Sequence, residues 1–112
     1  MGVFVKGEVI TLPFPFTDLQ TTKIRPALVV LAVPKIDELV VCQITTRPSR
    51  LDYTIPLLAS DFEYGGLKFD SYIRPNHINT ADPAIVQTSE GKLKSEKLQE
   101  VLDAIIRILK EK

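Results

Sequence analysis

Apolar residues recur along the first 90 residues in short runs that are separated by proline, glycine, aspartate and threonine. These runs are four to eight residues long and rich in valine and isoleucine, which is typical of strands in a small sandwich or barrel. We expect strands at Val9–Leu12, Ala27–Val33, Leu39–Ile44, Tyr53–Leu57, Ser71–Ile78 and Ala84–Thr88. Residues 58–68 are expected to form a loop, with a turn at Gly65-Gly66.

Two of the runs predict more than a strand. Ala27–Val33 is apolar throughout, which indicates a strand covered on both faces. In the run that ends at Leu57, apolar and polar positions alternate, and Pro56 places that strand at a sheet edge or near its own end.

The pattern becomes helical near the C-terminus. From Ser95 onward the apolar positions follow the spacing i, i+3, i+4, i+7, i+8 and i+11, so one helical face carries Leu98, Val101, Leu102, Ile105, Ile106 and Leu109. Ser95 is predicted to be the N-cap of this helix. We expect its apolar face to pack on the sheet; the alternative is that part of it meets a partner chain.

Composition limits the class of protein. A chain of 112 residues with 45% hydrophobic and 25% charged residues fits one domain, residues 1–112. No apolar run approaches the roughly 20 residues that cross a bilayer, and the first residues lack the features of a signal peptide, so we expect a cytoplasmic protein with no membrane contact. Cys42, the single cysteine, is expected to be a reduced and buried thiol.

Charge argues against a protein that coats nucleic acid through bulk electrostatics, because the net charge is +0 and the pI is about 6.6. A local basic segment does exist. Residues 43–50 contain two arginines, three hydroxyl side chains and no acid. The segment is either a site for a polyanion or an ordinary solvated turn.

Arg25 is the most informative single residue. Pro26 disfavours helical geometry at Arg25, and the apolar run that follows holds the arginine at the rim of a core. A guanidinium fixed there suits bidentate recognition of phosphate. His77 is the sole histidine, so one chain cannot supply a two-histidine acid/base pair, and on its own His77 is expected to be a structural residue at a strand end.

Several motifs together carry a resemblance to a known family. The chain contains Lys-Gly-Glu-Val-Ile-Thr-Leu-Pro at residues 6–13, Ile-Arg-Pro-Ala-Leu-Val-Val at 24–30 and an apolar strand that ends in Ile-Thr at 44–45. Asp70–Arg74, Ile78–Thr80 and Gly91–Leu93 follow in the same order as in the family. In this respect the chain resembles the MazF/PemK-like toxins of type II toxin–antitoxin systems over nearly its whole length.

The resemblance implies an α+β, mainly β fold: an SH3-like small barrel of the CcdB/MazF type with a C-terminal helix. It implies a homodimer and a sequence-selective endoribonuclease that cleaves single-stranded RNA without a metal or other cofactor. In such toxins the ribose 2′-hydroxyl attacks its own phosphate, and the catalytic pair corresponds to Arg25 and Thr45. A cognate antitoxin is the implied protein partner.

Further RNA contacts are expected at Thr46, Arg47, Arg50, Arg74, His77 and Asn79. The chain departs from many family members at two places. It has Asp18-Leu19-Gln20-Thr21-Thr22 where they carry Gly-Ser-Glu, and Asn79 where they carry the arginine of Ile-Arg-Thr. Arg74 or Arg47 is expected to replace that arginine, and Asp18 and His77 are candidates for the general base.

Two other classes remain open. The domain could be a non-catalytic SH3-like binding module, or a CcdB-like toxin that acts on a protein target, in which case Arg25 would serve as an anchor. It could also be an enzyme that acts on another phosphodiester, such as a particular tRNA.

Overall fold

The computed structural model describes residues 3–15, 22–47 and 53–111. Within these ranges the chain forms β1 (Glu8–Pro15), β2 (Thr22–Val33), η1 (Pro34–Ile36), β3 (Glu38–Thr45), β4 (Ile55–Leu57), η2 (Ala59–Asp61), β5 (Phe62–Gly65), β6 (Ser71–Ala81), η3 (Pro83–Ile85), β7 (Thr88–Leu93) and α1 (Ser95–Lys110), where η denotes a 3-10 helix.

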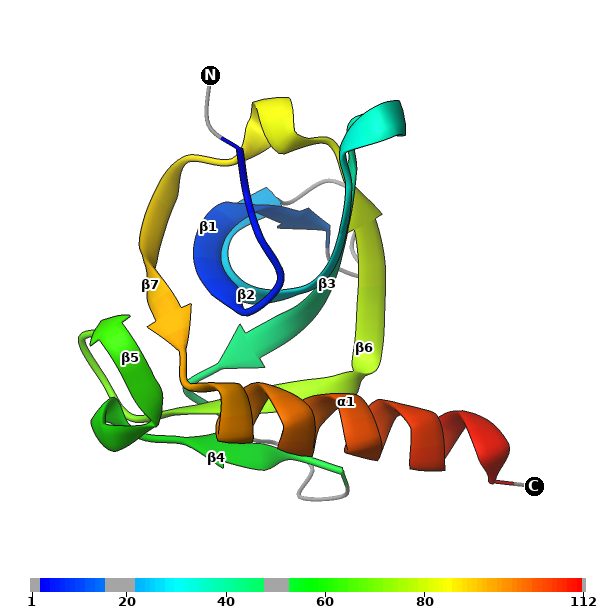
Figure 1. The fold of residues 1–112 in the computed structure, drawn as a ribbon. Coiled ribbons are helices and arrows are strands. Elements are labelled where there is room, and N and C mark those ends of the chain that lie inside the picture. The colour runs from blue at the N-terminus through cyan, green and yellow to red at the C-terminus, as the bar shows by residue number, and fades with distance from the viewer. Residues whose placement is uncertain (1–2, 16–21, 48–52, 112) are drawn as a thin grey trace.

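The strands form one antiparallel sheet in the order β4-β6-β3-β2-β1-β7-β5. The sheet curls into a half-barrel, and α1 lies along one side of it (Figure 1). The expected mainly β barrel with a C-terminal helix is therefore confirmed. The edge position that Pro56 predicts is also confirmed, because β4 is one of the two edge strands.

The core consists of two apolar clusters on opposite faces of β2. Leu28 and Val30 face the cluster that includes Val101 of α1, whereas Ala27 and Val29 face the cluster inside the curl of the sheet. The prediction that this strand is covered on both faces is confirmed for Ala27–Val30, which are all buried, but it is wrong for the end of the strand, where Leu31 is 45% exposed. Cys42 is fully buried in the first cluster, as expected, and burial raises the pKa of its thiol to about 12.

A bend in β6 separates the two halves of the sheet. Gln43 of β3 pairs with Arg74, but the preceding residue, Cys42, pairs with Ile78, so three residues of β6 have no counterpart in β3. Such bulges bend a strand, and Pro75 inside this one is fully buried and has no N–H to leave unpaired. Figure 1 shows β6 turning sharply between the part beside β4 and the part that runs up beside β3.

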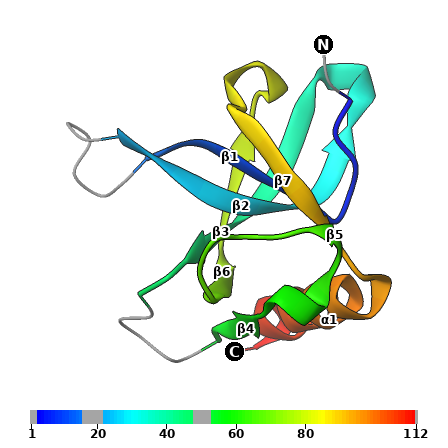
Figure 2. The same cartoon turned by 90° about the vertical axis from the view of Figure 1, so that its left-hand side faces the viewer.

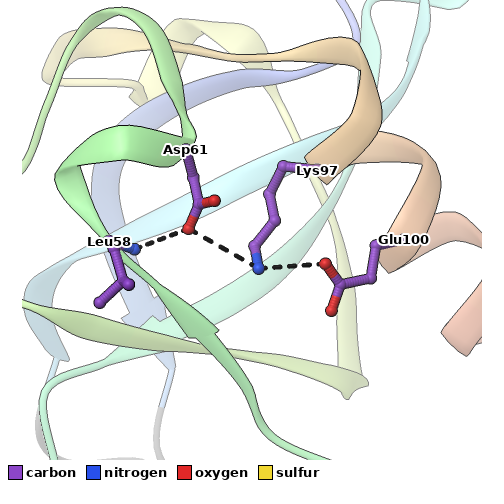
Figure 3. A network of polar contacts seen from close by, with 4 residues as sticks. All are labelled: Leu58, Asp61, Lys97 and Glu100. Carbon is purple, nitrogen blue, oxygen red and sulfur yellow. Dashed lines mark hydrogen bonds and ion pairs between the residues drawn. The ribbon is translucent and has the colours of Figure 1, made fainter.

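The first turn of α1 is attached to η2 through Asp61. The Asp61 carboxylate accepts a hydrogen bond from the backbone N–H of Leu58 (2.8 Å) and lies 3.6 Å from Lys97 Nζ (Figure 3). Lys97 also contacts Glu100 at 3.1 Å, and the Lys94 N–H donates to the Asp61 carbonyl oxygen at 2.9 Å. These contacts fix where the helix begins relative to the edge of the sheet.

Asp61→Ala is expected to lower the free energy of unfolding by about 1–2 kcal/mol, because it removes a carboxylate that accepts a backbone hydrogen bond and faces a largely buried lysine. Urea unfolding followed by circular dichroism measures the change. The matched control is Asp103→Ala, whose carboxylate accepts a hydrogen bond from Gln99 on the exposed side of α1 and should alter stability by less than about 0.5 kcal/mol. Equal effects of the two substitutions would contradict this role for Asp61.

Three expectations about the elements are wrong. Ala84–Thr88 is not a strand: Asp82 accepts a hydrogen bond from the Ala84 N–H and Pro83 starts η3, so the chain turns there and β7 begins only at Thr88. Ser95 is not the N-cap, because the extended residue Lys94 precedes the helix and provides no side-chain cap. Residues 58–68 are not a simple loop, since they contain η2 and β5.

Candidate functional site

The site begins where β2 and β3 separate. The pairing of β2 with β3 ends at Ala27 and Gln43, yet β2 continues to pair with β1 as far as Thr22. Pro26 has no N–H to donate, so it cannot extend the ladder toward β3. As Figure 2 shows, β1 and β2 project from the sheet as a two-stranded arm, with the end of β3 below it.

A polar pocket of about 310 Å³ lies between this arm and the end of β3. It is lined by Lys23 and Arg25 from the arm and by Thr45, Thr46 and Arg47 from the end of β3 and the residues after it. Three of these side chains are cationic, two carry hydroxyls, and none of the described residues that line the pocket is acidic. The pocket therefore concentrates positive potential in a chain whose net charge is +0.

Strand periodicity explains how Arg25 reaches the pocket. Alternate residues of β2 point to the same face, and these include Lys23, Arg25 and Ala27. Along this row Lys23 is exposed, Arg25 is half-buried and Ala27 is fully buried. Arg25 thus stands at the boundary between core and pocket, the rim position that the Arg-Pro motif predicts. It lies within β2, however, and not at its head, because β2 begins at Thr22.

Thr45 is the last residue of β3, and its hydroxyl organises the chain that follows. Thr45 Oγ1 accepts a hydrogen bond from the Arg47 N–H at 3.1 Å, which shapes the turn that carries Thr46 and Arg47 into the pocket lining. The same hydroxyl donates a long hydrogen bond of 3.4 Å to the Arg47 carbonyl oxygen, and its hydrogen can rotate from that oxygen to another acceptor. Thr45 can therefore hold this turn and still donate to an anion in the pocket.

A second cluster of polar side chains lies on the same face of the sheet and begins at Gln43, two residues before Thr45 on β3. Gln43 is buried, and its Oε1 accepts a hydrogen bond from Arg74 Nη1 at 3.2 Å. The same Nη1 lies 3.3 Å from Nδ1 of His77, across the bulge of β6. Burial and, to a smaller extent, the charge of Arg74 lower the pKa of His77 below its usual range. A neutral His77 can accept the Arg74 bond at Nδ1.

Because His77 is the only histidine, its titration can be followed by NMR without assignment. We expect its pKa to lie below 6.5, the value for the unfolded chain. The unfolded state then binds more protons than the folded state, so the free energy of unfolding should fall as the pH drops from about 6.5 through the folded-state pKa. His77→Gln should flatten this part of the profile; an unchanged slope in that variant would contradict the assignment.

The structure brings some of the predicted site residues together and leaves others apart. Arg25, Thr45, Thr46 and Arg47 line one pocket. Three other predicted residues lie outside that lining, on β6: Arg74, which pairs with Gln43, then His77, which contacts Arg74, and Asn79, which pairs with Val41. Asp18 and Arg50 lie outside the described residues.

Two residues of this region were missed from the sequence. One is Lys23, which lines the pocket. It lies two residues before Arg25, so the two share a face of β2, but the predicted strand began only at Ala27 whereas β2 begins at Thr22. Gln43 is the other, and its signal was a polar residue within an otherwise apolar strand. Among the described residues, Asn79 contacts none of these side chains. It pairs with Val41, which belongs to the core, and its Oδ1 is buried without a hydrogen-bond partner.

The arrangement suits an anion with several oxygens. Guanidinium and ammonium groups bind phosphate through charge-assisted hydrogen bonds, and the Thr45 hydroxyl adds a neutral donor on the opposite wall. Among the described residues, no group of three or more His, Cys, Asp or Glu side chains is placed to hold a metal ion, and no helix is long and apolar enough to cross a bilayer.

Comparison with known proteins gives a consistent picture. The family model described as PemK-like, MazF-like toxin of type II toxin–antitoxin system matches residues 5–109. No curated protein matches the chain significantly. Solved structures with the same fold include MazF from Deinococcus radiodurans, with a TM-score of 0.78 and 19% identity over 99% of this chain and 100% of that one.

Two further solved structures are complexes. A mycobacterial endoribonuclease with its cognate antitoxin has a TM-score of 0.74 and 14% identity, covering 96% of this chain and 95% of that one. The MazE-MazF complex from Deinococcus radiodurans has a TM-score of 0.73 and 19% identity over 100% of both chains. At these identities the likeness establishes the fold, whereas the family model covers nearly all of the sequence. The chain belongs to the PemK-like, MazF-like family of toxins of type II toxin–antitoxin systems.

Proposed function

We propose that this protein is the toxin of a toxin–antitoxin pair and that it cleaves single-stranded RNA without a metal ion. Endoribonuclease activity is typical of its family. The observation that carries the proposal is that Arg25 and Thr45, which come from different strands, line one cation-rich pocket that is open to solvent. An extended phosphodiester chain could lie between the arm and the end of β3.

In the proposed reaction the ribose 2′-oxygen attacks the adjacent phosphorus. The bond to the 5′-oxygen of the next nucleotide breaks, the 2′-hydroxyl gives up its proton and the leaving 5′-oxygen takes one up, which leaves a 2′,3′-cyclic phosphate and a 5′-hydroxyl. Negative charge grows on the non-bridging oxygens during attack, and a fixed guanidinium with a hydroxyl donor stabilises that charge more than it stabilises the ground state. We assign this role to Arg25 and Thr45. A guanidinium with a pKa above about 12 is poorly suited to giving up a proton near neutral pH.

The proposed partners follow from the same pocket. A cognate antitoxin with an acidic, extended segment would compete with RNA for Lys23, Arg25 and Arg47, because carboxylates and phosphates use the same donors. We also propose a homodimer, as is typical of the family, with its action on RNA in the cytoplasm. Sedimentation of the purified protein measures the oligomeric state.

Induced expression, with and without the protein encoded by the neighbouring reading frame, tests the proposal in cells. We expect growth arrest that this neighbour relieves, together with new RNA 5′ ends in sequencing of the arrested cells. Arrest without new 5′ ends would instead favour a toxin that acts on a protein target. New ends confined to one tRNA would narrow the substrate to that RNA.

A further inference from the structure

Arg74 is held in a way that the proposed cleavage step does not require. Among the residues that the structure describes, Arg74 has two side-chain hydrogen-bond partners, Gln43 Oε1 and His77 Nδ1, and both contact the single nitrogen Nη1. Neither uses Nη2 or Nε, and these two nitrogens form the edge of a guanidinium that binds a phosphate or carboxylate bidentately. The two neighbours therefore fix the orientation of the group without occupying its anion-binding edge.

The position of Arg74 relative to the pocket follows from the register. Ala27, Gln43 and Arg74 form one row across β2, β3 and β6, and Thr45 pairs with Tyr72, two residues before Arg74. Directly paired residues and residues two apart share a face of the sheet, so Arg74 is the diagonal neighbour of Thr45 on the pocket side. The Cα atoms of such neighbours are about 7–8 Å apart, and side chains that start from this separation can reach consecutive phosphates of an extended single strand.

We propose that Arg74 binds a second RNA phosphate, next to the one at which Arg25 and Thr45 act, and that Gln43 is the positioning residue for Arg74. This inference rests on the proposed function, and it names a subsite that the cleavage step alone does not need. Gln43 can orient Arg74 firmly because its own side chain is only 6% exposed. His77 supplies the second contact to Nη1 and, at neutral pH, adds no competing charge.

Binding of a short fluorescent single strand with 2′-fluoro sugars tests the subsite apart from catalysis, because this oligonucleotide lacks the attacking hydroxyl. Arg74→Met should weaken binding about 10-fold and reduce the slope of log affinity against log salt by about 0.7, the value for one lost phosphate contact on a single strand. Gln43→Met should weaken binding about 5-fold, since it is similar in length but cannot accept the Arg74 bond.

The double variant identifies a positioning role. If Gln43 acts through Arg74, then Gln43→Met in the Arg74→Met background should change the affinity by less than about 2-fold. Gln99→Met, on the exposed side of α1, is the matched control and should bind as the wild type does. Because Gln43 is buried, urea unfolding confirms that each variant folds, and Arg74→Met tests the subsite even if Gln43→Met does not fold.

His77 provides a readout that a merely structural role would not affect. Bound phosphate beside Arg74 should offset the charge of the guanidinium, so the oligonucleotide should raise the pKa of His77 in the wild type but not in Arg74→Met. Unchanged affinity and salt slope in Arg74→Met would overturn the subsite, and additive effects in the double variant would overturn the role of Gln43. Either result would leave RNA cleavage by the wild type intact, whereas a wild type that never cuts RNA would refute the proposed function itself.

Discussion

Arg25→Ala is expected to reduce the rate of RNA cleavage by about 100-fold or more, the usual effect of removing one fixed donor to a developing oxyanion. The loss should appear in kcat more than in KM, because the donor acts mainly on charge that forms in the transition state. Thr45→Ala should have an effect of similar size. Steady-state cleavage of a labelled RNA that contains the preferred site measures both.

The controls for these variants are on the same molecule. Arg107→Ala and Thr80→Ala remove an arginine and a threonine that are exposed on α1 and β6, away from the pocket lining, and should leave cleavage unchanged. Arg25→Lys should recover only part of the activity, since an ammonium group keeps the charge but not the planar fork. Cleavage at the wild-type rate by Arg25→Ala would place the active site elsewhere.

Gly65→Ala is expected to destabilise the fold by about 3 kcal/mol or more. Gly65 has φ 74°, and a Cβ at this position would lie 2.2 Å from the Glu90 carbonyl oxygen and 2.6 Å from the Gly91 Cα, where β5 meets β7. Both the left-handed backbone and the close approach favour glycine, and neither neighbouring atom belongs to a side chain that could move away. Urea unfolding measures the change in free energy.

The adjacent residue is the control for this prediction. At Gly66 a new Cβ would meet no atom within 4 Å, so Gly66→Ala should change stability by less than about 1 kcal/mol. Equal stability of the two variants would show that β5 and β7 are not held as closely as the structure places them. The sequence motif Gly65-Gly66 predicts a turn but cannot distinguish these two glycines, because only the partner strand makes one of them indispensable.

Much of the fold was accessible from local patterns. The period of α1 and the apolar strands β2 and β3 were predicted because each buries a face that its own residues define. The bend in β6 was not, since it depends on how Arg74–Ile78 are matched to Cys42 and Gln43 of another strand. Similarly, β5 is only four residues long and acquires its geometry from β7. Register between distant segments is information that neither period nor composition contains.

In the candidate site, too, some residues could be identified from local sequence, whereas others depend on pairing between distant strands. The Arg-Pro motif places Arg25 at the rim of the core, and the Ile-Thr strand end selects Thr45, so this pair could be named from the sequence through resemblance. Lys23 could not, because the extension of β2 back to Thr22 relies on pairing with β1. The contact between Gln43, Arg74 and His77 likewise arises from the bulge in β6.

The most direct test of the account is incubation of the purified wild-type protein with single-stranded RNA in the presence of EDTA, followed by analysis of the new ends. The account predicts cleavage at preferred sites, with a 2′,3′-cyclic phosphate on one fragment and a 5′-hydroxyl on the other. RNA that stays intact, or fragments that form only after Mg²⁺ is restored, would contradict the proposal that Arg25 and Thr45 stabilise attack by the ribose hydroxyl in this pocket.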